Sequence, residues 1–133
     1  MNLTRIGYFK EMPHAESTDP SIHDFIGKSK IGENETEMAC KYLRNAPVLA
    51  ACAGLTTDVI DPDKGISGNP SAMTDGVWVW PGDYVYYVET YRLPVNEDFL
   101  EHMKSRTWDP SFDVMSLDFD NLKFINIDGS ALA

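Results

Sequence analysis

The stretch that decides the fold is residues 75–91, DGVWVWPGDYVYYVETY. β-Branched and aromatic residues alternate from Val77 to Trp80, which predicts a strand with both tryptophans on one face. Two continuations are open after Pro81: a hairpin into a second aromatic strand, or a helix capped by Asp83. The helix fits better, because four apolar residues share one stripe at helical spacing. They are Tyr84, Tyr87, Val88 and Tyr91.

Two more helices are predicted on either side of this stretch. The first spans about residues 35–44, with Asn34 as its cap and Pro47 beyond its end. The second begins after the cap Asn96 and turns Phe99, Leu100 and Met103 inward. A short helical turn after Pro20 would bury Ile22, Phe25 and Ile26.

The remaining segments predict strands and loops. Residues 48–60 are interpreted as extended and largely buried, and residues 115–127 as a hairpin that turns at 120–121. Breaker residues predict surface loops at 11–32 and 61–76. We therefore expect a single α+β domain, residues 1–133, with a small, mainly antiparallel sheet and about three helices packed on it.

Charge limits the classes of partner. The 133 residues carry 11 Lys and Arg against 21 Asp and Glu, a formal net charge of −10. Such a field repels phosphate backbones and anionic lipid, so we expect no nucleic-acid or membrane-surface partner. Residues 67–133 hold four basic and eleven acidic side chains, a net of −7 out of the −10. An electrostatic partner is therefore expected to meet mainly the second half.

The sequence favours a cytoplasmic protein. Two cysteines, Cys40 and Cys52, do not make a disulfide framework in a chain of this length, and the first ten residues lack the apolar run of a signal peptide. The longest nearly apolar stretch, residues 46–55, is about half as long as the roughly 20 residues of a membrane span.

Motifs that carry chemistry are not found in the sequence. Gly65-Ile66-Ser67-Gly68-Asn69 misses the last glycine of a nucleophile elbow, and the three histidines are widely separated. Two acidic triplets, residues 61–63 and 118–120, have the initial spacing of a calcium loop but lack its glycine and glutamate. We therefore expect no catalytic residue, no metal and no cofactor.

An aromatic pocket is the alternative to a protein without catalysis. In this interpretation the chain is a small enzyme or a ligand-binding protein. Its pocket would lie near Trp78, Trp80 and Tyr84, with carboxylates supplied by residues 58–63. Aromatic residues at strand and helix spacing are also the usual filling of a core.

Residues 74–104 carry a resemblance to a family of small bacterial proteins. The shared pattern runs TDGVWVWPGD from residue 74, continues through Tyr86-Tyr87-Val88, and extends from Leu93-Pro94 to Met103. It covers about a quarter of the chain, and some of these proteins resemble immunity proteins of polymorphic-toxin and contact-dependent systems. The resemblance implies a cytoplasmic protein that binds and blocks another protein, and it transfers no catalytic residue.

An acidic inhibitor of a basic toxin domain is consistent with the charge. Long-range attraction speeds the encounter, and a few desolvated anchors supply affinity. The candidate partner-binding surface is the outward side of residues 83–101, formed by Asp83, Tyr86, Glu89, Glu97 and Glu101. A homo-oligomer whose aromatic stripe forms the interface is a further interpretation.

Overall fold

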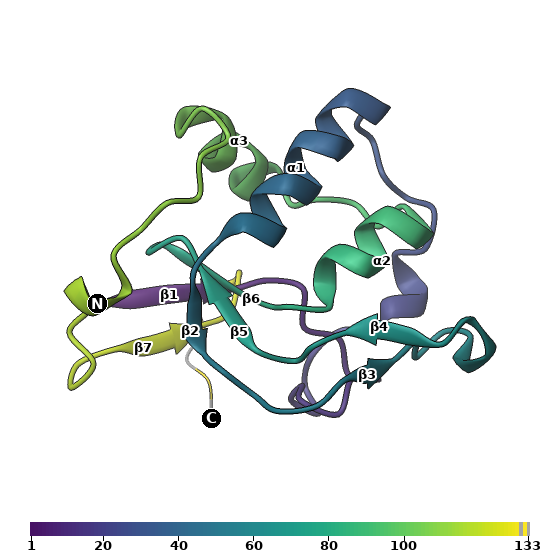
Figure 1. Ribbon diagram of the computed structural model, residues 1–133, viewed down its shortest axis with the longest axis horizontal. Helices are drawn as coiled ribbons and strands as arrows, with labels where there is room; N and C mark the ends of the chain where they lie inside the picture. The colour runs from purple at the N-terminus through teal and green to yellow at the C-terminus, as the bar shows by residue number, and fades with distance from the viewer. Residues whose placement is uncertain (131, 133) are drawn as a thin grey trace.

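Five strands form the main sheet of the computed structural model, which describes residues 1–130 and 132 (Figure 1). Their order is β2-β5-β6-β1-β7. The strands are β1 (Asn2–Arg5), β2 (Val48–Ala50), β5 (Ala72–Thr74), β6 (Trp78–Pro81) and β7 (Lys123–Ile125). A separate two-stranded sheet pairs β3 (Thr56–Thr57) with β4 (Ile66–Gly68).

The main sheet is mixed. β5 pairs antiparallel with β2 and β6, whereas β1 lies parallel to both β6 and β7. The register places Thr4 opposite Trp78 on one side and opposite Ile125 on the other. With the helices α1 (Glu33–Asn45), α2 (Tyr84–Tyr91) and α3 (Glu97–Ser105), this architecture confirms the predicted α+β class.

The core lies between the sheet and the helices, which Figure 1 shows above β5 and β6. Trp78 and Trp80 both point into it, as the alternation predicts, and are 8% and 1% exposed. The ring of Phe99 from α3 stacks on Trp78 at 4.8 Å between centroids and lies 5.4 Å from Trp80. The Trp80 indole N–H donates to the carbonyl of Leu43 at 3.2 Å, so its one polar atom is satisfied.

The segment after Pro81 is a helix, as the apolar stripe predicts. Tyr84, Tyr87 and Val88 are buried and Tyr91 is half-buried. Tyr84 packs face-on against Gly7, where a Cβ atom would lie 2.3 Å from the ring and φ is +77°. Only glycine combines that φ with the absence of a side chain, so this contact fixes where β1 ends against α2.

The predicted N-terminal cap is confirmed for α3 but not for α1. Asn96 caps α3 as expected, because its side chain accepts from the N–H groups of Asp98 and Phe99. The predicted cap of α1, Asn34, was wrong: the helix begins two residues earlier than predicted, at Glu33, with Gly32 in the cap position. Acidic residues in this first turn favour the extension, because the partial positive charge of the helix N-terminus attracts them.

Two predictions about extended segments were wrong. Residues 48–60 do hold two extended segments, β2 and β3, but they are mostly exposed and not largely buried, since β2 is a short edge strand and Leu55 is 67% exposed. Residues 61–76 hold β4 and β5 as well as the short 3-10 helix Pro62–Lys64, because the turn formers there occupy the corners between short strands.

The predicted hairpin at 115–127 does not form. Asp113 accepts from the N–H of Met115 and begins a 3-10 helix over Val114–Ser116, while Lys123–Ile125 joins the free edge of β1. The turn after Pro20 is a 3-10 helix, Ile22–Asp24, which buries Ile22 but leaves Phe25 half-buried and Ile26 exposed.

Candidate functional site

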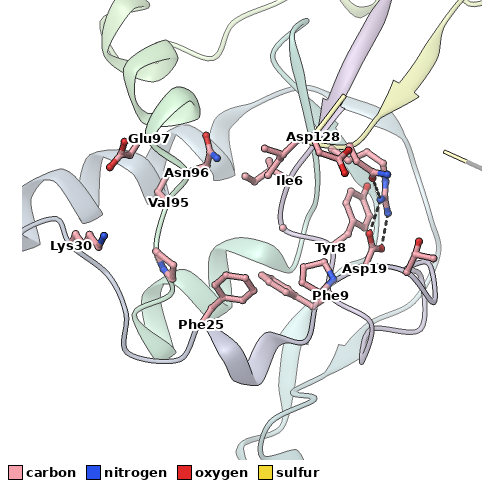
Figure 2. Close-up of a pocket in the computed structure, with 17 residues that line it drawn as sticks. Ile6, Tyr8, Phe9, Asp19, Phe25, Lys30, Val95, Asn96, Glu97 and Asp128 are labelled. Carbon is pink, nitrogen blue, oxygen red and sulfur yellow. Dashed lines mark hydrogen bonds and ion pairs between the residues drawn. The ribbon is translucent and has the colours of Figure 1, made fainter. Parts of the chain in front are cut away.

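A cavity of about 590 Å³ opens where the chain leaves β1. Residues from four separate parts of the sequence line it: the ranges 5–9, 18–30, 94–97, which leads into α3, and 126–128, which follows β7. Figure 2 shows Lys30 and Glu97 at one end, Asp19 and Asp128 at the other, and Ile6, Phe9 and Phe25 between them. The cavity is therefore apolar in its middle and charged at its ends.

A buried ion pair closes one end. Two nitrogens of the Arg5 guanidinium donate to the two carboxylate oxygens of Asp19 at 2.8 and 2.9 Å, and one of them also donates to Asn126 at 2.9 Å. The same guanidinium lies 4.4 Å from the centre of the Tyr8 ring. Burial raises the pKa of Tyr8 to about 12 against the opposing charge of Arg5, so the phenol is neutral at physiological pH. The floor of this end carries no net charge.

The middle of the cavity is built from side chains of the core. Phe9 and Phe25 lie 5.7 Å apart between ring centroids, and Ile6 and Val95 are each less than 10% exposed. The rim residues Lys30, Glu97 and Asp128 are exposed, and within residues 1–130 and 132 none of them forms an ion pair. These three charges are available to a ligand.

The aromatic residues predicted as a pocket form the core instead. Trp78, Trp80 and Tyr84 are 8%, 1% and 2% exposed, and none of them lines the 590 Å³ cavity. The pocket was therefore predicted in the wrong place, because a strand and a helix that bury the same kind of residue pack those residues against each other. The buried carboxylates nearby, Asp58 and Asp75, are also engaged in hydrogen bonds within the protein.

Asp58 accounts for one of those carboxylates. It is 1% exposed and accepts four hydrogen bonds: from the phenols of Tyr86 (2.7 Å) and Tyr91 (2.6 Å), and from the N–H groups of Ile60 and Asp61 (2.8 Å each). Burial alone would raise the pKa of Asp58, but the hydrogen bonds from Tyr91, Asp61, Tyr86 and Ile60 outweigh it and lower that pKa. Asp58 thus fastens the 58–66 loop to α2.

Asp75 is buried in the same manner on the other side of the core. Its carboxylate accepts from Tyr42 at 2.6 Å and from the N–H groups of Val77 and Trp78 at 2.9 and 2.8 Å. His102 Nε2 of α3 lies 3.2 Å from it. These contacts hold the turn between β5 and β6 against α1 and α3, so the Asp-Gly pair of the fold-deciding stretch has a structural role.

The surface predicted for a partner is only partly a surface. Asp83 is 1% exposed; it accepts from the Thr56 hydroxyl at 3.1 Å and lies 3.3 Å from His14 Nε2, so it cannot contact a partner directly. Tyr86 is half-buried against Asp58. Glu89, Glu97 and Glu101 are exposed, with Glu89 paired to Arg44 at 2.8 Å and Glu101 to Lys104 at 3.6 Å.

Sequence reasoning missed a second acidic surface, residues 109–128, here called the acidic segment. It carries five aspartates and one lysine, and all five aspartates are exposed. Within the described chain no lysine, arginine or histidine nitrogen lies within 4 Å of their carboxylates. Three apolar side chains in the same segment are also exposed: Met115 (82%), Phe119 (52%) and Ile127 (53%). The sequence did carry a signal of these residues: Met115 and Phe119 alternate with polar residues, which led to the prediction of a hairpin that does not form.

Residues 1–130 and 132 present no metal-binding cluster and no membrane-spanning helix. In that range no group of three or more His, Cys, Asp and Glu could hold a metal ion. No helix among the same residues has the length and apolar character to cross a membrane. Comparison of the chain with protein-family models, with curated proteins and with solved structures finds no match.

Proposed function

We propose that this chain is an acidic protein-binding module of the immunity type, which captures a basic partner, such as a toxin domain, and blocks it. The observation that carries the proposal is the acidic segment. Its five carboxylates are exposed and form no ion pair with the described residues, and Met115, Phe119 and Ile127 are exposed in the same segment, whereas the carboxylates of Asp58 and Asp75 are buried and hydrogen-bonded within the core.

Charge and apolar contact have separate roles in such a surface. The net charge of −4 within residues 109–128 attracts a cationic surface from a distance and raises the association rate. Apolar and aromatic anchors at the centre of an interface supply most of the affinity once water is excluded. Phe119 stands between Asp118 and Asp120, so one anchor and two steering charges are adjacent in the chain.

Binding to a cationic surface would inhibit the partner by blocking its substrate site. A nuclease or other phosphate-binding domain exposes lysine and arginine side chains at its substrate site. Carboxylates placed on that site replace the phosphates and exclude the substrate. Glu97 of α3, which belongs to the surface predicted from the sequence, borders the same cavity as Asp128 and extends the negative field toward α3.

The test is to mix the purified protein with the product of the adjacent upstream gene and to co-express the two. A complex, together with restored growth of cells that express the upstream product, supports the proposal. Absence of both contradicts it.

Two sets of variants locate the contact. Asp118→Asn with Asp120→Asn is expected to weaken binding by about 3- to 10-fold at low salt, because exposed charge pairs contribute up to about 1 kcal/mol each. Phe119→Ala is expected to weaken it by about 30-fold, as for an anchor worth about 2 kcal/mol. The matched control, Asp24→Asn with Asp63→Asn, makes the same change in net charge elsewhere on the exposed surface. An equal loss in the control would show that net charge alone, and not the acidic segment, is responsible.

A further inference from the structure

We infer that the cavity beside β1 is a binding site for a small amphiphilic cation, with an aromatic or branched apolar body and one positively charged end. The inference goes beyond the proposed function, since it concerns a small molecule. Its volume of about 590 Å³ lies within the roughly 300–1,000 Å³ typical of small-molecule sites.

The apolar body is accounted for by the middle of the cavity. The rings of Phe9 and Phe25 and the side chains of Ile6 and Val95 line it, and these residues are held by the core or packed against it. A ligand that covers them removes its own apolar surface and theirs from water without ordering a loop. An aromatic ligand body suits this wall, because the wall already holds the aromatic pair Phe9 and Phe25, whose rings meet at 52°, and aromatic rings pack favourably against one another.

The buried ion pair argues against an anionic ligand. Both terminal nitrogens of the Arg5 guanidinium already donate hydrogen bonds to the carboxylate of Asp19, and one of them also donates to the side chain of Asn126. An incoming carboxylate or phosphate would have to displace Asp19, which also accepts from the N–H of Glu16 at 2.8 Å. Breaking such a buried pair leaves a buried charge without a partner, which is strongly unfavourable. Arg5 therefore shapes the site and does not receive an anion.

The remaining charges at the rim select a cation. Asp128 and Glu97 oppose the single ammonium of Lys30, and Figure 2 places Asp128 at the end away from Lys30. One oxygen of Asp128 accepts from the N–H and hydroxyl of Ser130, while the other accepts no hydrogen bond from the described residues. Asp128 lines the cavity together with the apolar side chains, in a protein of net charge −10. A ligand ammonium beside it is attracted by both the local and the overall field.

Three matched probes test the charge as well as the site: 2-(1-naphthyl)ethylammonium, 1-naphthylacetate and 2-(1-naphthyl)ethanol. They are titrated into the ¹⁵N-labelled full chain, and amide shifts are followed at Ile6, Phe9 and Val95. The ammonium is expected to bind at least 10-fold more tightly than the carboxylate and more tightly than the alcohol. Absence of saturable shifts at these residues, or equal binding of the three probes, overturns the inference.

Two aspartate variants separate a local effect from the overall charge. Asp128→Asn is expected to weaken binding of the ammonium 3- to 10-fold and to leave the alcohol unchanged. Asp120→Asn makes the same change in net charge outside the lining of the cavity and is expected to change neither. Equal losses in the two variants contradict the assignment to Asp128. The titration needs no protein partner, so its failure is distinguishable from failure to form a complex.

Discussion

Replacing Asp58 by alanine tests the tightest polar cluster in the molecule. The change leaves four donors without their acceptor: the phenols of Tyr86 and Tyr91 and the N–H groups of Ile60 and Asp61. A donor left unpaired costs about 1–3 kcal/mol, and the lower end applies here because both tyrosines are half-buried and can reach water. The expected loss in the free energy of unfolding is about 4 kcal/mol, a large share of the roughly 5–15 kcal/mol typical of a domain.

Urea unfolding followed by tryptophan fluorescence measures this loss. The matched control is Asp63→Ala in the same loop, where the side chain is exposed and accepts no hydrogen bond from the described residues, and its expected change is within about 0.5 kcal/mol. Tyr91→Phe in both backgrounds supplies a double-mutant cycle, in which the substitution costs less once Asp58 is absent. A loss below about 1 kcal/mol for Asp58→Ala, or an equal effect of Tyr91→Phe in both backgrounds, would refute the reasoning.

The same cluster gives stability a defined pH dependence. Because the pKa of Asp58 is lowered in the folded protein, its contribution is fully present above the pKa of the unfolded chain, about 3.9, and is lost as pH falls through the folded value. The difference in urea midpoint between the wild type and Asp58→Ala is therefore expected to shrink below about pH 4. A difference that stays constant from pH 6 to pH 3 contradicts the lowered pKa.

Three further predictions concern the core, one turn and one phenol. Phe99→Ala is expected to lower the free energy of unfolding by about 3–5 kcal/mol, because it removes a fully buried ring that contacts both tryptophans; a loss under about 1 kcal/mol in urea unfolding contradicts this. Gly76→Ala is expected to cost at least about 2 kcal/mol, since φ is +94° and the new Cβ would lie 2.4 Å from the ring of Phe112, and adding Phe112→Ala should recover part of the loss in the same assay. Burial and the hydrogen bond to Asp58 raise the pKa of Tyr86 to about 12, the same value as for Tyr8, so two phenols are expected to titrate near pH 12 by absorbance at 295 nm and only that of Tyr86 to shift downward in Asp58→Asn.

The strand and helix of residues 75–91 could be predicted because each carries a strong period of its own. Alternation placed Trp78 and Trp80 on one face, and the i, i+3, i+4, i+7 stripe placed Tyr84 and Tyr87 on another. The cap of α3 could be predicted for a similar reason, since Asn96 bonds to N–H groups only two and three residues away. Such local interactions are present in the sequence itself.

Pairing across the sheet could not be predicted, because no local pattern in or near Lys123–Ile125 indicates that this strand pairs with β1. The cavity is hidden from sequence for the same reason, as its lining comes from four segments and Arg5 meets Asp19 only in the folded chain. One signal was available. Arg5 follows Leu3 on the inward side of the first strand, and a basic residue at a buried strand position requires an acidic partner.

The position of β1 between β6 and β7 determines when the sheet can be completed during synthesis. Thr4 is opposite Trp78, 74 residues later, and opposite Ile125, 121 residues later. During synthesis β1 leaves the ribosome long before β6 and β7 are made. The N–H and C=O groups along both of its edges therefore have no strand partner until the later segments emerge. The entropy cost of closing loops of this length is incurred before strand pairing contributes any stabilisation, and this slows folding. The sheet is therefore completed only after translation has passed residue 125. Until then β1 is the segment with the greatest need of protection from aggregation through its unpaired edges.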